Sequence, residues 1–304
     1  MTRIFAVTGA TGHVGGRVAQ QLLAAGHQVR AVVRDDKSKA SLALKEKGAE
    51  LWIASYDDVA ALTAAFTGVE AAFLMIPPGF TETDPDGAAF LQVLHLKEAV
   101  VTSGVKRIVL LSSVGAHHAH GTGVIVKLHY LEREFRTLAP KVAVGFLRPG
   151  YFAENTLGLM PVALSQGILP TMVDLDLKIP ITTTQDIGDQ AAKMLQEDFH
   201  SVRIVELEGP ERVSYGDVAK IISDITGKPV QPVPVPEEKW APTFEGFGFT
   251  KACAKQMADL VKGMNQGVVA YEGHHENAKG SITYKGFATT AIAEQKKAEE
   301  AKKN

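Results

Sequence analysis

The residues with the clearest chemical meaning form a glycine-rich turn near the start of the chain. Gly9, Gly12 and Gly15 recur as G-x-x-G-x-x-G between an apolar run and a helical pattern. Glycines allow a tight turn, a close approach of ligand to main-chain N–H groups, and close packing of helix on strand. The following helix N-terminus adds free donors and a positive dipole end. The turn therefore predicts a dinucleotide diphosphate site, with a turn that serves packing alone as the alternative.

The residues after the second expected strand decide which dinucleotide fits. An acidic side chain there would bind the ribose 2′-hydroxyl of NAD, whereas this chain has Val33-Arg34-Asp35-Asp36-Lys37. The Arg34 guanidinium can pair with a 2′-phosphate and stack on adenine, so NADP(H) is favoured over NAD(H). Asp35 and Asp36 leave NAD open, because a shift of one residue would bring a carboxylate there. A solvated Arg34 is the structural alternative.

Strands and helices alternate through the first half of the chain. Apolar runs predict strands at 3–8, 28–33, 49–54, 71–76, 107–112 and 142–147, and helical patterns lie between them at 15–25, 38–47, 59–66, 88–103 and 123–138. Strands joined by helices of this length predict an α/β fold, a Rossmann-type doubly wound parallel sheet with helices on both faces.

Beyond Pro149 the alternation becomes irregular. Helices are expected at 151–166, 184–196 and 214–226, short strands and turns at 167–181, an extended segment at 230–236, and a strand returning to the sheet at 203–207. We therefore expect an NAD(P)-binding domain over residues 1–154, a smaller α/β substrate lobe over 155–290, and a flexible charged tail over 291–304.

Composition excludes several classes of protein. The 304 residues include 32 basic and 34 acidic side chains, a net charge of −2, which argues against binding to nucleic acid or to a membrane surface. Cys253 is the only cysteine, which excludes an intramolecular disulfide and a thiolate-rich metal site and indicates a reducing compartment. No run approaches ~18 uninterrupted apolar residues. We expect a cytoplasmic protein with a small-molecule substrate, and a homo-oligomer is left open.

Taken together, the motifs resemble the NmrA-like branch of the atypical short-chain dehydrogenases/reductases. That branch includes NADPH-dependent quinone reductases, triphenylmethane-dye reductases and redox-sensing regulators. The segments that carry the resemblance are Thr8–Gly15, Val32–Arg34, Leu110–Gly115, Lys127 with Glu132, and Leu147–Asn155.

The resemblance implies a role for each matching position. The diphosphate would lie on the turn, the 2′-phosphate on Arg34, and the nicotinamide ribose on Lys127. The segment Pro149–Asn155 would separate cofactor from substrate, and Ser55 stands where the family usually has an acidic residue near the adenine. The implied cofactor-binding residues are Gly9, Thr11, Gly12, His13, Val14, Arg34, Ser55, Met75, Ile76, Pro77, Lys127, Pro149 and Tyr151.

The catalytic pattern departs from the wider superfamily. Ordinary members use Tyr-x-x-x-Lys, in which the Tyr is the general acid, but Gly123 stands four residues before Lys127. Lys127 remains the catalytic candidate. The resemblance then implies hydride delivery to an acceptor that is already electrophilic, such as a quinone or a cationic dye, with protonation by water.

Residues for the substrate side are weaker candidates. They are Ser113, His117, Phe152 and Asn155, joined by Trp240, Phe244, Phe247 and Phe249 as an aromatic lining, with core packing as the alternative. The histidines at 117, 118 and 120 lack the supporting ligands of a metal site, so no metal is expected.

Three functions are compatible with the sequence. The favoured one is an NAD(P)H-dependent reductase of a quinone-like or conjugated small molecule. The alternatives are a non-enzymatic NAD(P)-binding redox sensor that signals to a protein partner, and an isomerase or epimerase, which the missing Tyr disfavours.

Overall fold

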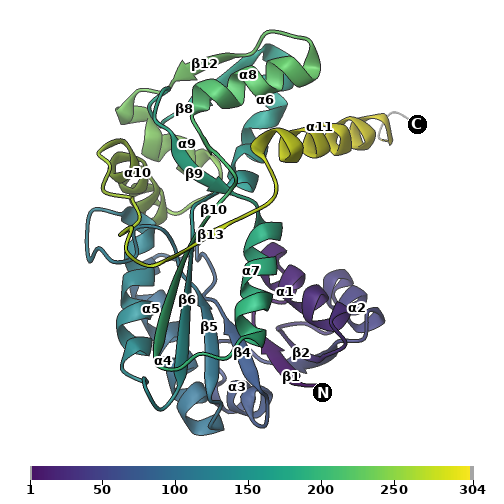
Figure 1. Ribbon diagram of the computed structural model, residues 1–304. Coiled ribbons are helices and arrows are strands. Elements are labelled where there is room, and N and C mark those ends of the chain that lie inside the picture. The colour runs from purple at the N-terminus through teal and green to yellow at the C-terminus, as the bar shows by residue number, and fades with distance from the viewer. Residues whose placement is uncertain (1, 302–304) are drawn as a thin grey trace.

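The computed structural model describes residues 2–301, and a parallel sheet organises most of them (Figure 1). Within this range the sheet has eight strands in the order β13-β10-β6-β5-β4-β1-β2-β3, and every pairing in it is parallel. The strands are β1 (Ile4–Val7), β2 (Gln28–Val33), β3 (Glu50–Ile53), β4 (Ala71–Leu74), β5 (Arg107–Leu111), β6 (Ala143–Pro149), β10 (Val202–Glu208) and β13 (Glu276–Lys279).

Helices cover both faces of the sheet. One face packs against α1 (His13–Ala24), α2 (Lys39–Glu46) and α7 (Thr184–Gln196), and the other against α3 (Val59–Phe66), α4 (Pro85–Ser103) and α5 (Val126–Arg136). Successive strand residues point to opposite faces, so Phe5 and Val7 join the first core and Ala6 joins the second. Both faces are buried, which is why the strands read as continuous apolar runs. The predicted doubly wound fold is confirmed.

The order of the strands reverses between β1 and β4. Chain order runs outward from β1 through β2 and β3, then resumes on the other side with β4, β5 and β6. Open α/β sheets bind ligands at the carboxyl ends of the strands at such a reversal. The glycine-rich turn after β1 and the segment after β4 therefore border the expected crevice.

A second lobe lies above the carboxyl ends of the strands (Figure 1). Its own core includes Leu169, Val218 and Trp240. Its strands and α-helices are β7 (Tyr151–Phe152), α6 (Met160–Gln166), β8 (Ile168–Thr171), β9 (Ile179–Thr182), β11 (Arg212–Val213), α8 (Tyr215–Thr226), β12 (Gln231–Pro234), α9 (Trp240–Gly246) and α10 (Lys251–Asn265). It also has 3-10 turns at Ala153–Leu159 and Glu237–Lys239, whereas the 3-10 turn at Gly123–Ile125 leads into α5 of the first domain. Its strands form the small sheets β11-β9-β7 and β12-β8. None of the helices described is long and apolar enough to cross a membrane.

The helix expected at 151–166 is wrong at its start. Tyr151 and Phe152 pair with Ile181 and Thr182 as β7, and α-helix begins only at Met160. The cause is tertiary: Gly150 lies so close to the next segment that a Cβ there would be 2.3 Å from the Pro180 carbonyl oxygen. This approach holds the chain extended past the end of β6.

The chain also returns to the sheet more often than the sequence indicates. Besides α7 and β10, the segment Glu276–Lys279 adds β13 at the edge, which the sequence pattern did not predict. Helix α11 (Tyr284–Ala301) then covers part of the expected tail, with Ile292 buried and Lys296 exposed. Residues 302–304 lie outside the described residues, and the flexibility of the tail stays a prediction.

Candidate active site

Helix α1 begins at the glycine-rich turn without a side-chain cap from any of residues 2–301. Gly12 is the N-cap, with φ −90° and ψ 176°, and the first turn contains no acidic residue. Thr11, Gly12 and His13 are exposed. Free N–H groups and the positive end of the helix dipole therefore face solvent, an arrangement that binds phosphate.

Most other helices begin with a side-chain cap, and the exceptions α5, α6 and α9 each continue from a 3-10 turn, which α1 does not. The N-cap side chain accepts a backbone N–H bond in α2, α3, α4, α7, α8 and α10, through Ser38, Asp58, Asp84, Thr183, Ser214 and Thr250. Helix α7 packs directly on α1, and its first turn is closed further because the Glu154 carboxylate accepts from the Thr184 N–H at 2.8 Å. Of these two adjacent N-termini, that of α1 is left for a ligand.

Two of the three motif glycines, Gly9 and Gly15, are required by the geometry of the turn. Gly9 has φ +61°, and a Cβ there would lie 2.5 Å from the Met75 sulfur. A Cβ at Gly15 would lie 2.3 Å from the Gly9 carbonyl oxygen, which in turn accepts from the Gly12 N–H at 2.9 Å. The turn therefore brings the start of α1 against the end of β1, and Gly9 of the turn lies against Met75 after β4.

The segment after β4 is tied to its neighbours on both sides. The Thr8 hydroxyl donates to the Phe73 carbonyl at 3.2 Å and accepts from the Met75 N–H at 3.0 Å. The Tyr56 hydroxyl donates to the Met75 carbonyl at 2.5 Å. Ile76 is buried and Pro77 is half-buried. Met75 to Pro77 thus lie beside the turn, where the resemblance puts the ribose and nicotinamide.

Arg34 lies at the exposed end of β2 and has no hydrogen-bond or ion-pair partner in the described part of the chain. The Asp35 carboxylate instead accepts from the Lys37 N–H at 2.9 Å. Burial raises the pKa of Tyr56 to about 12, while the nearby Arg34 charge opposes that rise. After β3 it is therefore Tyr56, rather than the exposed Ser55, whose side chain is hydrogen-bonded into the site.

Lys127 is buried, with 7% of its surface exposed. Its Nζ donates to the carbonyl oxygen of Pro78, directly after the predicted cofactor residue Pro77. Burial lowers its pKa to about 8, which the charges of Cys253 and Asp86 oppose in part. Lys127 thus lies beside the segment after β4, and its bond to the nicotinamide ribose stays a prediction.

The position four residues before Lys127 cannot hold a side chain. Gly123 has φ +54°, and a Cβ there would lie 2.1 Å from the Gln256 carbonyl oxygen and 2.4 Å from the Leu260 nitrogen of α10. Both atoms are backbone, so no rotamer change could make room. A Tyr at this position would require α10 to move.

A buried charged network lies next to this site, at the carboxyl ends of β5 and β6. Arg148 Nη2 pairs with Glu132 Oε2 at 2.7 Å, with the two side chains only 1% and 3% exposed. The Ser112 hydroxyl donates to Glu132 at 2.6 Å, and Arg148 also pairs with Glu272. Burial opposes ionisation of Glu132, but the hydrogen bonds from Arg148, Ser112 and Arg136 outweigh it and lower its pKa. We refer to Ser112, Glu132, Arg148 and Glu272 as the buried network.

His117 lies beside the buried network. Burial lowers its pKa, as does the neighbouring His118, whereas Glu272 raises it. Its Nδ1 is buried without a hydrogen-bond partner among residues 2–301. Ser113 is half-buried in the same loop after β5. These two predicted substrate residues are therefore near each other along the chain and near the end of β6.

Glu272 and two histidines form a cluster that resembles a set of metal ligands. The nearest ligand atoms of Glu272, His274 and His275 lie within 4.8 Å of one another. However, the Glu272 carboxylate pairs with Arg148 and with His275. The hydrogen bonds from Arg148 and His275 outweigh the effect of burial and hold the pKa of Glu272 down at about 2. Its charge is thus already compensated by arginine, which disfavours a cation there.

The segment after β6 has mixed contacts. Pro149 is buried, and its carbonyl accepts from the Val114 N–H at 2.9 Å, which joins this segment to the loop of Ser113. The Tyr151 hydroxyl lies 3.3 Å from that of Tyr215, and Phe152 packs against the sheet core. Asn155 is exposed, but its side chain contacts Tyr151.

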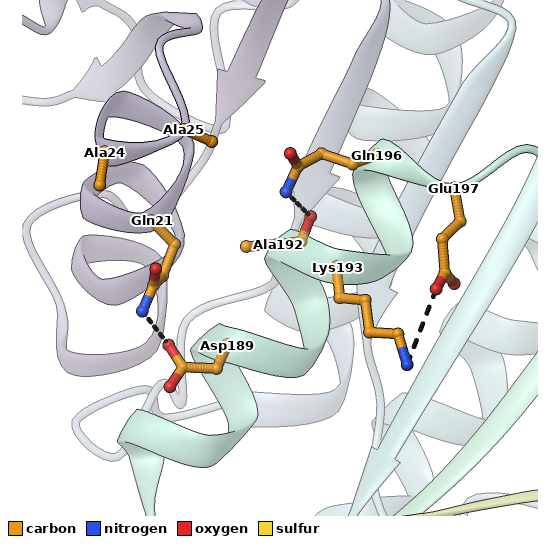
Figure 2. Close-up of a pocket in the computed structure, with 8 residues that line it drawn as sticks. All are labelled: Gln21, Ala24, Ala25, Asp189, Ala192, Lys193, Gln196 and Glu197. Atoms are coloured by element: carbon orange, nitrogen blue, oxygen red, sulfur yellow. Dashed lines mark hydrogen bonds and ion pairs between the residues drawn. The ribbon is translucent and has the colours of Figure 1, made fainter.

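A separate groove lies between α1 and α7, away from these residues. Figure 2 shows its lining, which includes Gln21, Asp189 and Gln196, and its volume is about 720 Å³. It lies along the C-terminal halves of both helices, at the opposite end of α1 from Gly12. Asp189 is already engaged by Gln21 and by both ends of the Arg17 guanidinium. The groove is therefore not the predicted cofactor crevice.

Comparison with known proteins defines the family. The profile of the NmrA-like family matches residues 1–299. Quinone oxidoreductase 2 of Escherichia coli (strain K12) is 28% identical over 293 residues, 96% of each chain. The NAD(P)H azoreductase of Xenophilus azovorans is 26% identical over 254 residues, 84% of this chain and 85% of that protein.

A solved structure is also similar over nearly the whole length. The NADPH-dependent quinone oxidoreductase of Escherichia coli, in complex with NADPH, superposes with a TM-score of 0.78 at 25% identity, covering 95% of this chain and 99% of that one. The chain therefore belongs to the NmrA-like family, as its motifs indicated.

Proposed function

We propose that this protein is an NADPH-dependent reductase that delivers a hydride to a quinone-like or otherwise conjugated small molecule. The observation that carries the proposal is the uncapped N-terminus of α1 beside the unpaired Arg34. The relatives support a reductase, since one of them is named a quinone oxidoreductase and another an NAD(P)H azoreductase. They do not favour the sensor alternative.

The binding roles follow from charge and position. The N–H groups after Gly12 hold the diphosphate. The Arg34 guanidinium holds the 2′-phosphate, because among the described residues Arg34 is the only unpaired arginine at the ends of β1 and β2. Met75, Ile76 and Pro77 border the ribose and nicotinamide, and Pro149 and Tyr151 form the wall toward the acceptor. NADPH, when bound, supplies the hydride.

The proton balance explains why an electrophilic acceptor is needed. Reduction adds a hydride and one proton to the acceptor, and Gly123 leaves no Tyr to supply that proton. A quinone accepts the hydride first, because the electrons delocalise over the conjugated system, and water then protonates the oxygen. Ser113 and His117, in the loop after β5, are the side chains we assign to the acceptor oxygen. We assign the choice of acceptor mainly to residues 155–290.

The test is direct. Purified protein is mixed with NADPH or NADH and a panel of quinones, azo dyes and conjugated enones, and the loss of the reduced-nicotinamide absorbance is followed. We expect turnover with NADPH above the rate without protein, and slower turnover with NADH. No turnover with any acceptor would contradict the proposal, and tight binding that distinguishes NADPH from NADP⁺ would then favour the sensor.

A further inference from the structure

The loop between β4 and α4, residues 75–84, is held from two sides. On the sheet side, Lys127 donates to the Pro78 carbonyl. On the side of α10, the Thr250 N–H donates to the Phe80 carbonyl at 3.1 Å, and the Thr250 hydroxyl donates to the Glu82 carbonyl at 2.7 Å. The loop is thus fixed between the residues that border the cofactor and the second lobe.

This loop presents an aromatic ring to the second lobe. Phe80 stacks on Phe249 with ring centroids 4.2 Å apart and an interplanar angle of 11°. Phe249 in turn stacks on Phe244 at 5.8 Å, and Phe244 meets Phe247 edge-on at 6.5 Å. We name these four residues, Phe80, Phe244, Phe247 and Phe249, the aromatic strip.

The aromatic strip is not a buried core. Phe247 is 60% exposed, and Phe80, Phe244 and Phe249 are each only partly buried. The other two aromatic residues expected in a substrate lining are used elsewhere: Trp240 is buried and donates to the Val235 carbonyl at 2.8 Å, and Phe152 packs on the sheet core. Contiguous apolar surface left open to water on a folded protein indicates a binding surface.

Its place in the chain connects the strip to the reaction site. Phe80 follows Pro77 by three residues, and the backbone between them is the segment that Lys127 holds. Ring stacking in offset geometry favours flat π-systems, so exposed ring surface of this kind suits a flat aromatic ligand better than a saturated one.

We infer that the aromatic strip binds the planar aromatic part of the acceptor, with Phe80 and Phe249 as the residues that determine specificity. The inference rests on the proposed function for its choice of acceptor. It adds that the preference for fused or multi-ring acceptors comes from side chains of two separate segments, the loop after β4 and the residues just before α10. The hydrogen bonds of Thr250 hold these two segments together.

The experiment measures binding apart from turnover. Affinity for naphthoquinone in the presence of NADP⁺ is determined by calorimetry for the wild type, Phe80→Leu, Phe249→Leu and the control Phe90→Leu. Phe90 is 38% exposed on α4, outside the strip, and Leu preserves apolar bulk at each position. Unfolding midpoints and NADP⁺ affinity verify that each variant is folded.

We expect Phe80→Leu and Phe249→Leu to weaken naphthoquinone binding about fivefold, within the range of aromatic pair energies, and Phe90→Leu to leave it unchanged. Cyclohexenone, which has no aromatic ring, should show no difference among the variants. Equal naphthoquinone affinity in all four proteins, or no binding by the wild type, would overturn the inference. Strip-dependent binding without turnover would uphold the strip and contradict the reductase proposal.

Discussion

Two polar regions lie at the carboxyl ends of the strands, and they differ in how their groups are satisfied. At the start of α1, backbone N–H groups face solvent without a side-chain cap from the described chain. At the ends of β5 and β6, Ser112, Glu132, Arg148 and Glu272 satisfy one another inside the protein. The first region is open for a ligand, and the second is closed.

This difference separates the polar groups that can bind a ligand from those that stabilise the fold. A buried charge that has its partners contributes specificity or rigidity and leaves little to offer a ligand. Unpaired N–H groups at the start of a helix cost little free energy where water reaches them, and they gain a partner when an anion binds. Lys127 lies between the two cases, because it is buried and the Pro78 carbonyl is its one hydrogen-bond partner among the described residues.

Breaking the closed region should have the largest effect on stability. Arg148→Met leaves Glu132 buried without its main partner, so we expect a loss of about 3–5 kcal/mol in the free energy of unfolding. Denaturant unfolding measures it. Arg203→Met is the control, since Arg203 also pairs with two carboxylates but is 20% exposed, and should cost about 1 kcal/mol or less. Equal losses in both variants would contradict the assignment.

Breaking the geometry of the open region should affect both stability and binding. Gly15→Ala forces a Cβ to within 2.3 Å of the Gly9 carbonyl oxygen, so we expect a loss of about 3 kcal/mol and no measurable NADPH binding. Gly158→Ala is the control because a Cβ there meets nothing within 4 Å. Thermal unfolding and fluorescence titration measure the two effects. Normal NADPH affinity in Gly15→Ala would show that the turn does not hold the cofactor.

Lys127 predicts a pH dependence of stability. Its folded pKa of about 8 lies below the ordinary value of 10.5, so between these values the unfolded chain binds a proton that the folded protein does not. Stability therefore rises with pH across this window, by at most about 3 kcal/mol. Denaturant unfolding of the wild type and of Lys127→Met from about pH 7 to 10.5 isolates this contribution. Parallel pH profiles for the two proteins would mean that Lys127 is not perturbed.

Removing the Arg34 charge should have the smallest and most selective effect. Arg34→Ala should weaken NADPH binding about tenfold and leave NADH binding and the unfolding midpoint unchanged, because Arg34 is exposed and unpaired in the described chain. Lys37→Ala, which removes an exposed cation three residues further on, is the control. Equal losses for NADPH and NADH would place the 2′-phosphate elsewhere.

The fold and the position of the glycine-rich turn could be predicted because both depend on local pattern. Buried strands between amphipathic helices determine the sheet order, and the spacing of Gly9, Gly12 and Gly15 alone indicates the turn. Asn155 and Phe152 were harder to place, since the extended segment at Tyr151–Phe152 exists only because Gly150 approaches Pro180. That contact has no signature in the local sequence.

Other site residues depend on long-range contacts in the same way. Tyr56 belongs to no sequence motif, and its place in the site follows only from its hydrogen bond to Met75, 19 residues away. Phe80 joins Phe249 across 169 residues of sequence, and Arg148 meets Glu272 across 124. A signal was available for Arg148, because an arginine inside an apolar strand must have a carboxylate partner.

The measurement that tests the central claim most directly compares Gly12→Asp with Gly12→Asn. Gly12 has backbone angles open to any residue, and a Cβ there meets only the Gly9 carbonyl at 3.3 Å. Both side chains can cap α1, but only Asp brings a negative charge to the proposed diphosphate position. We predict that fluorescence titration gives a Kd for NADPH about a hundredfold higher in Gly12→Asp than in Gly12→Asn, with both proteins folded. Equal Kd values would contradict an anion site at the start of α1.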